Sequence, residues 1–374
     1  MVRTGLMLAT SAVLPYHVMR CAAVAGVSVH VLGSVGAERL QRSRACARFH
    51  HLPMDLGNET KVVEIVRDLI AARDVDFVFP SDDASTRLLI SLRDQLDIPT
   101  SALPDLRCFD LHNDKWAFNQ LCVANGVSAP RSWLLPHTDA LAESLRSGAI
   151  RPPLTVKPVA CSGGAGVCHV LSRDDFDRVA GLRYSPILVQ RHIFGQELGV
   201  NVLCDRGRVQ AIAVQQRRRG SFRLIDHAAL AAAATRVAGA SALHGPANID
   251  AIIDANGTPF LLESNPRFWY TIYMSMVLGL NFVDMSIRLG CSGRIEDSQP
   301  SLDAVRLGRR LYSGLLKPWH CTHADWRMVR YHLADPLPYA AEKSGVARNG
   351  LPPEWSAASS IPEPALIAWS GRAH

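Results

Sequence analysis

The segment 248–267, which reads NIDAIIDANGTPFLLESNPR, constrains the fold more than any other part of the chain. The dipeptide Asn256-Gly257 in its middle is a strong signal for a tight turn between two antiparallel strands. A two-residue turn there fixes the pairing of the strands and sets Asp250 opposite Glu263. Because side chains alternate between the two faces of a strand, the neighbouring pair on the same face is also polar. The sequence therefore predicts a hairpin with a cluster of polar side chains on one face.

This predicted cluster contains two carboxylates, Asp250 and Glu263, and two amides, Asn248 and Asn265. Directly opposed carboxylates destabilise a strand pair by about 0.2–1 kcal/mol, so we expect a cation beside them. Hard oxygen ligands of this kind suit Mg²⁺, whose coordination is usually completed by water and substrate phosphates. The alternative is a polar ladder that faces solvent.

A lysine and a glycine-rich turn follow one another in the middle of the chain. Lys157 lies in a predicted strand over 154–158, and the sequence from it onward reads KPVACSGGAG. Such a turn lets backbone N–H groups approach phosphate oxygens closely. The lysine precedes the glycines, so the segment is not a GxxxxGK[ST] phosphate loop. A flexible hairpin loop and a phosphate-binding loop are both consistent with these residues.

A third candidate segment joins an apolar strand to a carboxylate. The residues ILVQ at 187–190 are typical of a buried strand, and Glu197 follows after a polar corner. The edge of such a strand offers backbone groups to a purine base, and a carboxylate accepts hydrogen bonds from ribose hydroxyls. An ordinary strand end is the alternative.

The first hundred residues have the pattern of a small doubly wound α/β unit. Apolar runs at 4–10, 27–32 and 75–79 alternate with helical patterns. No GxGxxG motif follows the first run, so we do not expect a dinucleotide site.

The pattern changes near residue 113, where a helix is predicted, and mostly strands are predicted from there to residue 266. We therefore expect an α/β domain over 1–112, a mixed α+β domain over 113–295, and a C-terminal extension over 296–374. The extension is expected to be partly helical, with a basic amphipathic helix over 302–316.

The bulk composition excludes several classes of protein. The chain has 374 residues and a formal charge of +6, and its basic residues are scattered, so a nucleic-acid platform is not expected. The densest basic cluster, Arg217–Arg219 with Arg223, suits a small anionic ligand, and a solvated turn is the alternative. Nine cysteines without a CxxC pair favour a reducing cytoplasm, and no apolar stretch reaches the roughly 18 residues of a membrane span.

Four motifs occur in a fixed order along the chain. A helix opened by Asp114-Lys115 is followed by the KP strand with its glycine-rich loop, the LVQ segment with Gly195 and Glu197, and finally LLESNPRFW. Together they resemble the ATP-grasp superfamily over roughly 114–267. The resemblance implies an ATP-grasp fold preceded by a small doubly wound α/β domain, the pre-ATP-grasp domain.

The resemblance also implies a role for each matching residue. The residues implied to bind the nucleotide are Lys115, Lys157, Ser162, Gly163, Gly164, Gly166, Gln190, Arg191, Ile193 and Glu197. Those implied to bind Mg²⁺, or Mn²⁺ in its place, are Asp250, Glu263 and Asn265. Arg267 is implied to stabilise the acyl phosphate or the transition state, with Lys157 as the second catalytic residue. The chain departs from the family at Arg191 and His192, where relatives often carry an acidic and an aromatic residue.

The implied activity is that of an ATP-dependent ligase. Such an enzyme activates a carboxylate as an acyl phosphate, joins it to an amine and releases ADP and phosphate. The alternatives are an ATP-grasp kinase, a carboxylase, or a non-catalytic ATP-binding sensor or scaffold. The expected partners are a small-molecule carboxylate and an amine, and the chain is compatible with a homodimer. Positions expected to line the substrate site are Asp82, Asp83, 217–223 and 268–271, although a helix cap also explains the two aspartates.

Overall fold

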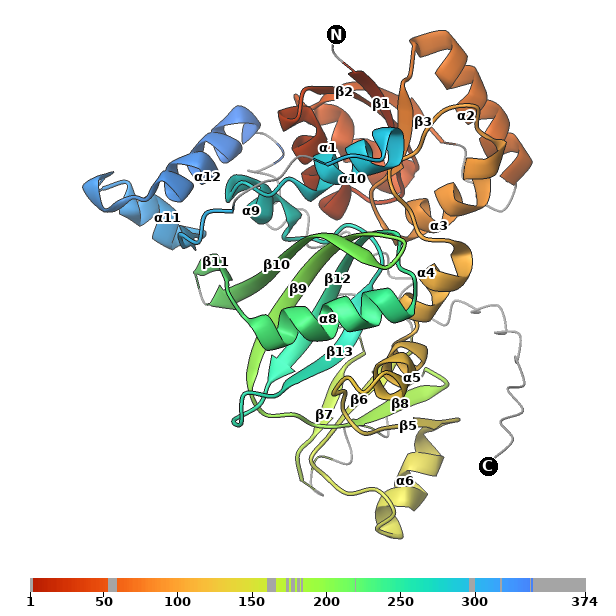
Figure 1. The fold of residues 1–374 in the computed structure, drawn as a ribbon, viewed down its shortest axis with the longest axis vertical. Coiled ribbons are helices and arrows are strands. Elements are labelled where there is room, and N and C mark those ends of the chain that lie inside the picture. Colours follow the sequence, from red (N-terminus) through yellow and green to blue (C-terminus); the bar gives the residue numbers. More distant parts are fainter. Residues whose placement is uncertain are drawn as a thin grey trace.

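Three β-sheets organise the part of the chain that the computed structural model describes (Figure 1). The described residues are 3–52, 59–159, 166–172, 175, 179, 182, 184–218, 220–295, 300–316, 318–336 and 338. The predicted Ser162, Gly163 and Gly164 lie outside them.

The N-terminal unit is a parallel sheet with helices on both faces. Its strands are β1 (Arg3–Ala9), β2 (Val27–Gly33), β3 (Cys46–His51) and β4 (Phe77–Pro80), in the order β3-β2-β1-β4. Its helices are α1 (Val13–Val24), α2 (Glu59–Arg73), α3 (Asp83–Leu92) and α4 (Leu106–Asn113), with the 3₁₀ helices η1 (Val35–Arg42) and η2 (Arg93–Gln95). The inner strand β1 is apolar because both faces of a parallel sheet are covered. The predicted doubly wound α/β unit is confirmed.

A small antiparallel sheet follows. Its strands are β5 (Ser132–Leu135), β6 (Leu154–Pro158), β7 (Cys168–Val170) and β8 (Ile187–Arg191), in the order β5-β8-β6-β7. The helices of this region are α5 (Lys115–Ala124) and α6 (Thr138–Arg146). Asp114 caps α5 by accepting a hydrogen bond from the Ala117 N–H, so the motif's aspartate starts the helix and its lysine occupies the first turn.

The larger sheet has six strands, in the order β13-β12-β9-β10-β11-β14. Their bounds are β9 (Gln196–Asp205), β10 (Arg208–Arg218), β11 (Ser221–Ile225), β12 (Gly245–Ile253), β13 (Pro259–Asn265) and β14 (Val305–Arg306). One face packs against α8 (Ala228–Ala240), with Val200 and Val202 in the shared core. By the two-residue repeat of a strand, Gly199 and Asn201 lie on the opposite face.

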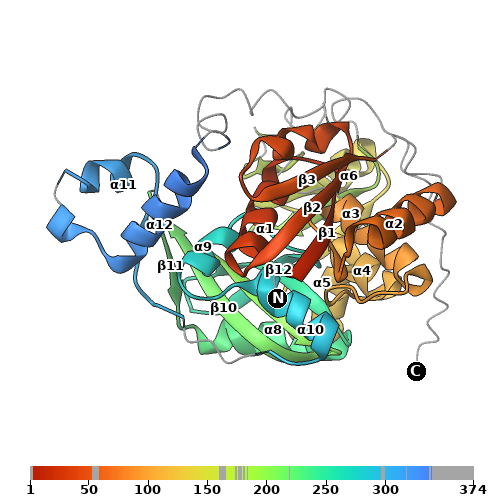
Figure 2. The same cartoon turned by 90° about the horizontal axis from the view of Figure 1, so that it is seen from above.

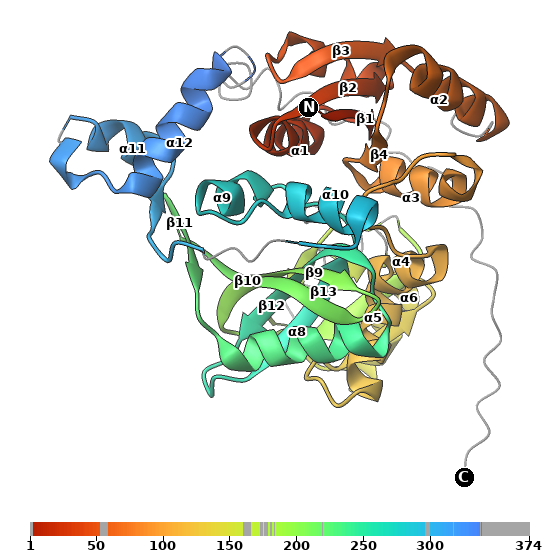
Figure 3. The same cartoon turned by 45° about the horizontal axis from the view of Figure 1, so that its top comes forward.

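Two short helices connect the sheets. In Figures 1 and 3, α9 (Ile272–Val277) and α10 (Phe282–Ser292) form a layer between the N-terminal unit and the larger sheet. Helix α1 contacts both of them, and α10 contacts β9 and β12. The small sheet lies at the other end of the larger sheet, beyond β13 in Figure 1.

The C-terminal helices extend to one side of the molecule, as Figure 2 shows from above. They are α11 (Arg309–Gly314), η4 (Pro318–His320) and α12 (His323–Ala334). The predicted helix over 302–316 is wrong. Val305 instead pairs with Phe222 at the edge of the larger sheet, and Gly308 has a φ of 55° that stops a helix from running through it.

Candidate active site

A cavity of about 610 Å³ lies between the small sheet and the larger sheet. Seven residues that the sequence motifs singled out line it: Lys157, Gln190, Arg191, Ile193, Glu197, Asp250 and Glu263. Lining residues that the sequence analysis missed include Thr155, His169, Phe194 and Gln215, while Thr271 belongs to the expected positions 268–271. Arg217, from the basic cluster, also lines it. Seven of the predicted site residues therefore lie around one cavity, while Lys115, Asn265 and Arg267 are not among its lining residues. The individual roles of all of them stay predictions.

The hairpin has the predicted strand pairing but a different turn. Asp250 pairs with Glu263, and Asn248 pairs with Asn265, as expected. The two-residue turn is wrong, because Ile253 pairs with Pro259 and the connection is therefore longer. A β-bulge lies between the turn and Asp250, and it offsets the extra residue of the longer turn. The polar pairs therefore return to the predicted register.

The bulge has a direct consequence for the site. Leu262 is the bulged residue, because its neighbours Leu261 and Glu263 pair with consecutive positions of β12. Its carbonyl oxygen accepts a hydrogen bond from Lys157 Nζ at 3.4 Å. The irregular strand thus helps to aim a lysine from the small sheet at the carboxylates of the larger sheet.

Two buried lysines converge on one carboxylate. Glu263 Oε2 lies 3.7 Å from Lys115 Nζ and 3.5 Å from Lys157 Nζ. Lys115 comes from the first turn of α5 and Lys157 from β6, and both side chains are almost fully buried. Burial lowers the pKa of Lys157, and Glu263 opposes that effect. Two cations beside a cavity are suited to a polyanion such as a nucleotide phosphate chain.

The second carboxylate of the cluster has the properties of a cation ligand. Burial and the neighbouring Glu263 raise the pKa of Asp250 to about 7. A divalent cation beside the two carboxylates would relieve this repulsion, and Asn265 supplies a third hard oxygen donor next to them. Among the described residues, no group of three or more His, Cys, Asp or Glu side chains forms a metal site. The donor set fits Mg²⁺, which uses one or two carboxylates together with phosphate and water.

A chain of amides continues from the carboxylates across the sheet. Asn248 Nδ2 donates to Asn201 Oδ1 at 2.9 Å, and Asn201 Nδ2 donates to Gln215 Oε1 at 3.1 Å. Thr271 Oγ1 also donates to Gln215 Oε1, at 2.8 Å. With its oxygen fixed by two donors, the Gln215 side chain is held in one orientation at the cavity wall. Strand alternation could have placed these residues on the site face once the strand order was known.

The other end of the cavity is formed by the segment that follows β8. Gln190 Nε2 donates to Ser132 Oγ at 3.0 Å, so this side chain fixes the strand edge. Gly195 has a structural reason to be glycine, because a Cβ there would lie 2.0 Å from the Ile253 carbonyl oxygen. The close approach puts Glu197, two residues later, on the cavity wall. Gly166 has a φ of 74° and follows the undescribed part of the glycine-rich loop.

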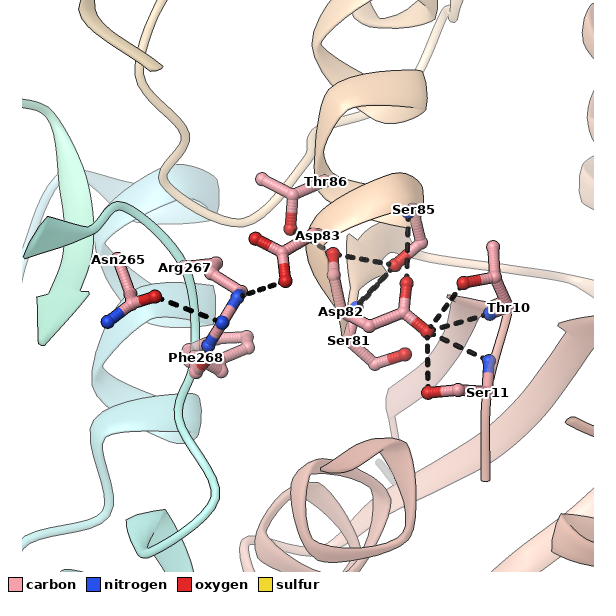
Figure 4. Close-up of polar contacts among 10 residues, drawn as sticks. All are labelled: Thr10, Ser11, Ser81, Asp82, Asp83, Ser85, Thr86, Asn265, Arg267 and Phe268. Atoms are coloured by element: carbon pink, nitrogen blue, oxygen red, sulfur yellow. Dashed lines mark hydrogen bonds and ion pairs between the residues drawn. The ribbon is translucent and has the colours of Figure 1, made fainter. Parts of the chain in front are cut away.

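Arg267 joins the larger sheet to the N-terminal unit (Figure 4). Its Nε lies 2.7 Å from Asp83 Oδ2, an ion pair whose N–H direction does not give a hydrogen bond. The remaining nitrogens donate to Asn265 Oδ1 at 3.1 Å and to the Phe268 carbonyl at 2.8 Å. Arg267 is 8% exposed, so this buried guanidinium is fixed from both sides.

The two aspartates at the end of β4 have different tasks. Asp82 is the N-cap of α3, and its other oxygen accepts hydrogen bonds from the backbone and hydroxyls of Thr10 and Ser11. The helix-cap alternative therefore describes Asp82. Figure 4 shows that Asp83 turns the other way, toward Arg267.

The architecture and the site together define an ATP-grasp fold with its preceding α/β domain, which confirms the resemblance. Residues 183–307, from just before β8 to just after β14, match the model of a family described as ATP-grasp in the biosynthetic pathway with Ter operon. No curated protein matches the chain in sequence.

Solved structures share this fold at low sequence identity. The L-amino acid ligase from Bacillus licheniformis is 18% identical with a TM-score of 0.61, over 78% of this chain and 75% of that one. An ADP complex of N5-carboxyaminoimidazole ribonucleotide synthetase is 15% identical with a TM-score of 0.65, over 85% of each chain. A biotin carboxylase from Campylobacter jejuni is 15% identical with a TM-score of 0.61, over 79% and 73% of the two chains. These likenesses establish the fold. In the described helices, none is long and apolar enough to cross a membrane.

Proposed function

We propose that this chain is an ATP-dependent ligase that activates a carboxylate as an acyl phosphate and joins it to an amine. The observation that carries the proposal is that Lys157, Asp250 and Glu263 line the 610 Å³ cavity and that Lys115 lies behind them, against Glu263. Cations from the small sheet and carboxylates from the larger sheet can hold a phosphate chain and its metal between them. The similar structures include an L-amino acid ligase, which supports carbon–nitrogen bond formation.

The two lysines have a defined task in this proposal. Without nucleotide, both are neutralised by Glu263. When ATP binds, Lys115 and Lys157 contact its phosphate oxygens and offset the charge that develops as the γ-phosphoryl group moves. Asp250, Glu263 and Asn265 would hold Mg²⁺, which supplies charge neutralisation along the phosphates. Glu263 would then contact the metal ion in place of the two ammonium groups.

The carboxylate substrate reacts near Arg267 in this proposal. One of its oxygens attacks the γ-phosphorus, the bond from that phosphorus to the bridging oxygen breaks, and ADP leaves. The amine then attacks the acyl carbon, loses a proton, and releases phosphate. Arg267, buried and fixed by Asp83 and Asn265, is suited to stabilise the negative charge of the acyl phosphate. Among the described residues that line the cavity, none is a cysteine or a serine, which favours a route without a covalent enzyme intermediate.

We also expect the enzyme to work in the cytoplasm on small molecules. The eight described cysteines are all free, as is usual in a reducing compartment. Nucleotide contacts are proposed for Gln190, Arg191, Ile193 and Glu197, with the loop 162–166 over the phosphates. The oligomeric state stays open to a homodimer.

The test is a screen of acids and amines for ADP release in the presence of ATP and Mg²⁺. With the correct acid and hydroxylamine in place of the amine, a hydroxamate should form in an amount equal to the ADP. A stable phosphorylated product made without any amine would instead identify a kinase, and a requirement for bicarbonate would identify a carboxylase. Tight ATP binding with no stimulation by any acid would identify a sensor.

A further inference from the structure

A second, smaller cavity lies beside the first one. It has a volume of about 90 Å³ and is lined by Tyr16, His17, Arg217, Tyr270, Tyr273, Met274, Leu307, Gly308, Tyr331 and His332. Five parts of the chain meet there: α1, β10, the segment that runs from β13 into α9, the two residues after β14, and α12. Arg217 lines this cavity and the larger one, so the two share a wall.

The aromatic rings give this small cavity a rigid wall. His17 stacks on Tyr273 with ring centroids 4.1 Å apart, and Tyr273 stacks on Tyr331 at 5.1 Å. Tyr270 meets His17 edge to face at 5.1 Å and is 38% exposed, so it lies where the wall reaches the surface. His17 and Tyr331 are also joined by a hydrogen bond of 2.9 Å. The packed rings form one side of the cavity, while Arg217 itself is exposed.

Strand register puts Arg217 on the catalytic face of the sheet. Asp250 pairs with Gly199, and Gly199 pairs with Gln215, so the three residues form one row across β12, β9 and β10. Arg217 is two residues beyond Gln215 on the same face. From strand spacing and rise, its Cα lies about 12 Å from that of Asp250. A small substrate can therefore reach both the metal ligands and this arginine.

Arg217 differs from the other cations of the site in its partners. Lys157 and Arg267 each have a carboxylate within 4 Å, at 3.5 and 2.7 Å. For the described part of the chain, no ion pair with Arg217 is found, and no acidic residue lines the 90 Å³ cavity. Its neighbours on the wall are rings and neutral groups. A guanidinium in such surroundings attracts an anion of matching planar or tetrahedral geometry.

We propose that Arg217 and the 90 Å³ cavity bind a second anionic group of a substrate, a carboxylate or a phosphate. This inference rests on the proposed ligase function and narrows its substrate class. One of the two molecules to be joined carries an anionic group in addition to the carboxylate or amine that reacts. The cavity has room for such a group, and Arg217 supplies the bidentate donor for it.

The test compares charged substrates with neutral molecules of nearly the same shape. The pairs are glutamate and glutamine, aspartate and asparagine, and O-phosphoserine and serine, each supplied as acid and as amine, and succinate and succinamate, supplied as acids only. Wild-type protein should use the anionic member at least 10-fold better in kcat/KM. In Arg217→Gln, the ratio of kcat/KM for the anionic member to kcat/KM for the neutral member should fall by about 10- to 100-fold, with little change in the KM for ATP. Arg217→Lys should keep part of it.

Arg218 provides the matched control. Like Arg217, it is exposed and lies in β10. Although its position falls within the range 217–223 expected to line the substrate site, it lies on the opposite face of the strand and lines neither cavity. Arg218→Gln should behave as wild type. The phosphoserine pair separates a phosphate site from a carboxylate site, because only one of the two anions should give the full preference.

The outcomes separate this inference from the proposed function. ADP release stimulated equally by neutral and charged members, in wild type and Arg217→Gln alike, would overturn the anion site and leave the ligase intact. If no pair stimulates ADP release, thermal stabilisation by succinate and O-phosphoserine decides the question. Stabilisation that is lost in Arg217→Gln but not in Arg218→Gln would support the anion site even though the ligase proposal failed. Equal stabilisation of all three proteins would overturn it.

Discussion

Lys157 is buried although the proposed function has it contact the phosphates of ATP. Its pKa is lowered by burial, so the protonated side chain is costly to keep in place. We predict that Lys157→Met leaves the melting temperature within a few degrees of wild type, since Lys115 still neutralises Glu263. The affinity for ATP should fall by about 10- to 100-fold, the loss expected for one charge-assisted hydrogen bond. Calorimetric titration with ATP measures it, and an unchanged affinity would remove Lys157 from the nucleotide site.

His112 supports β13, the strand of the proposed metal ligands Glu263 and Asn265, from behind. Its Nδ1 lies 2.8 Å from Ser264 Oγ, between the two predicted ligands of β13, and its Nε2 lies 2.8 Å from Ser241 Oγ. Ser241 donates its own proton to backbone carbonyls, so we assign the imidazole proton to Nε2 and the acceptor to Nδ1. The ring must therefore be neutral, and complete burial lowers the pKa of His112 to about 4.

This lowered pKa makes stability depend on pH in a defined direction. The unfolded chain binds a proton near pH 6.5 and the folded chain only near pH 4, so stability is lost as the pH falls between these values. At about 1.4 kcal/mol per pH unit, wild type should lose about 2 kcal/mol from this group between pH 6.5 and 5. Urea unfolding of wild type and His112→Gln at both pH values isolates the effect. Identical pH slopes for the two proteins would contradict it.

At the scale of elements, the length of the turn between β12 and β13 was predicted wrongly from the sequence. The hairpin could be predicted because strand alternation and the Asn256-Gly257 signal act locally, but the predicted pairing of Asp250 with Glu263 holds only because a bulge offsets the longer turn. The longer turn and the compensating bulge at Leu262 could not be predicted locally. The carbonyl oxygen of the bulged residue accepts a hydrogen bond from Lys157, which comes from another sheet. The helix predicted over 302–316 failed for a similar reason, since pairing with Phe222 overrides local periodicity.

The segment between β8 and β9 provides a test at the same scale. Gly195→Ala would bring a Cβ to 2.0 Å from the Ile253 carbonyl oxygen, so the segment must move away from β12. We predict a loss of about 1–3 kcal/mol in the free energy of unfolding and a higher KM for ATP. Gly239→Ala in α8 is the control, because its added Cβ has no contact closer than 3.8 Å. It should be neutral or stabilising by up to about 1 kcal/mol. Equal effects of the two changes would show that the close approach is unimportant.

At the scale of the whole molecule, the catalytic face is completed by the N-terminal unit. Asp83, the first residue of α3, reaches to Arg267, which follows β13 and its proposed metal ligands. Local sequence patterns could not predict this contact, because the two residues lie in different units. They could predict that these residues occupy sheet edges and strand ends, where ligands commonly bind.

The contact predicts a specific kinetic defect. Asp83→Asn removes the charge that holds Arg267, so we expect kcat to fall by about 10-fold with the ATP dissociation constant unchanged. Asp83→Glu should recover most of the activity. Asp94→Asn, which alters an exposed ion pair with Arg93, is the control and should have no effect. A change in ATP affinity without a change in kcat would assign Asp83 to nucleotide binding instead.

The central claim is that a carboxylate oxygen attacks the γ-phosphorus of ATP. Oxygen transfer from a substrate labelled with ¹⁸O in both carboxylate oxygens tests it most directly. The account predicts that one labelled oxygen appears in the released inorganic phosphate, one remains in the amide product, and none enters the nucleotide, because phosphate leaves the acyl carbon with the oxygen that attacked. Label in AMP, or phosphate free of label during amide formation, would contradict the acyl phosphate route.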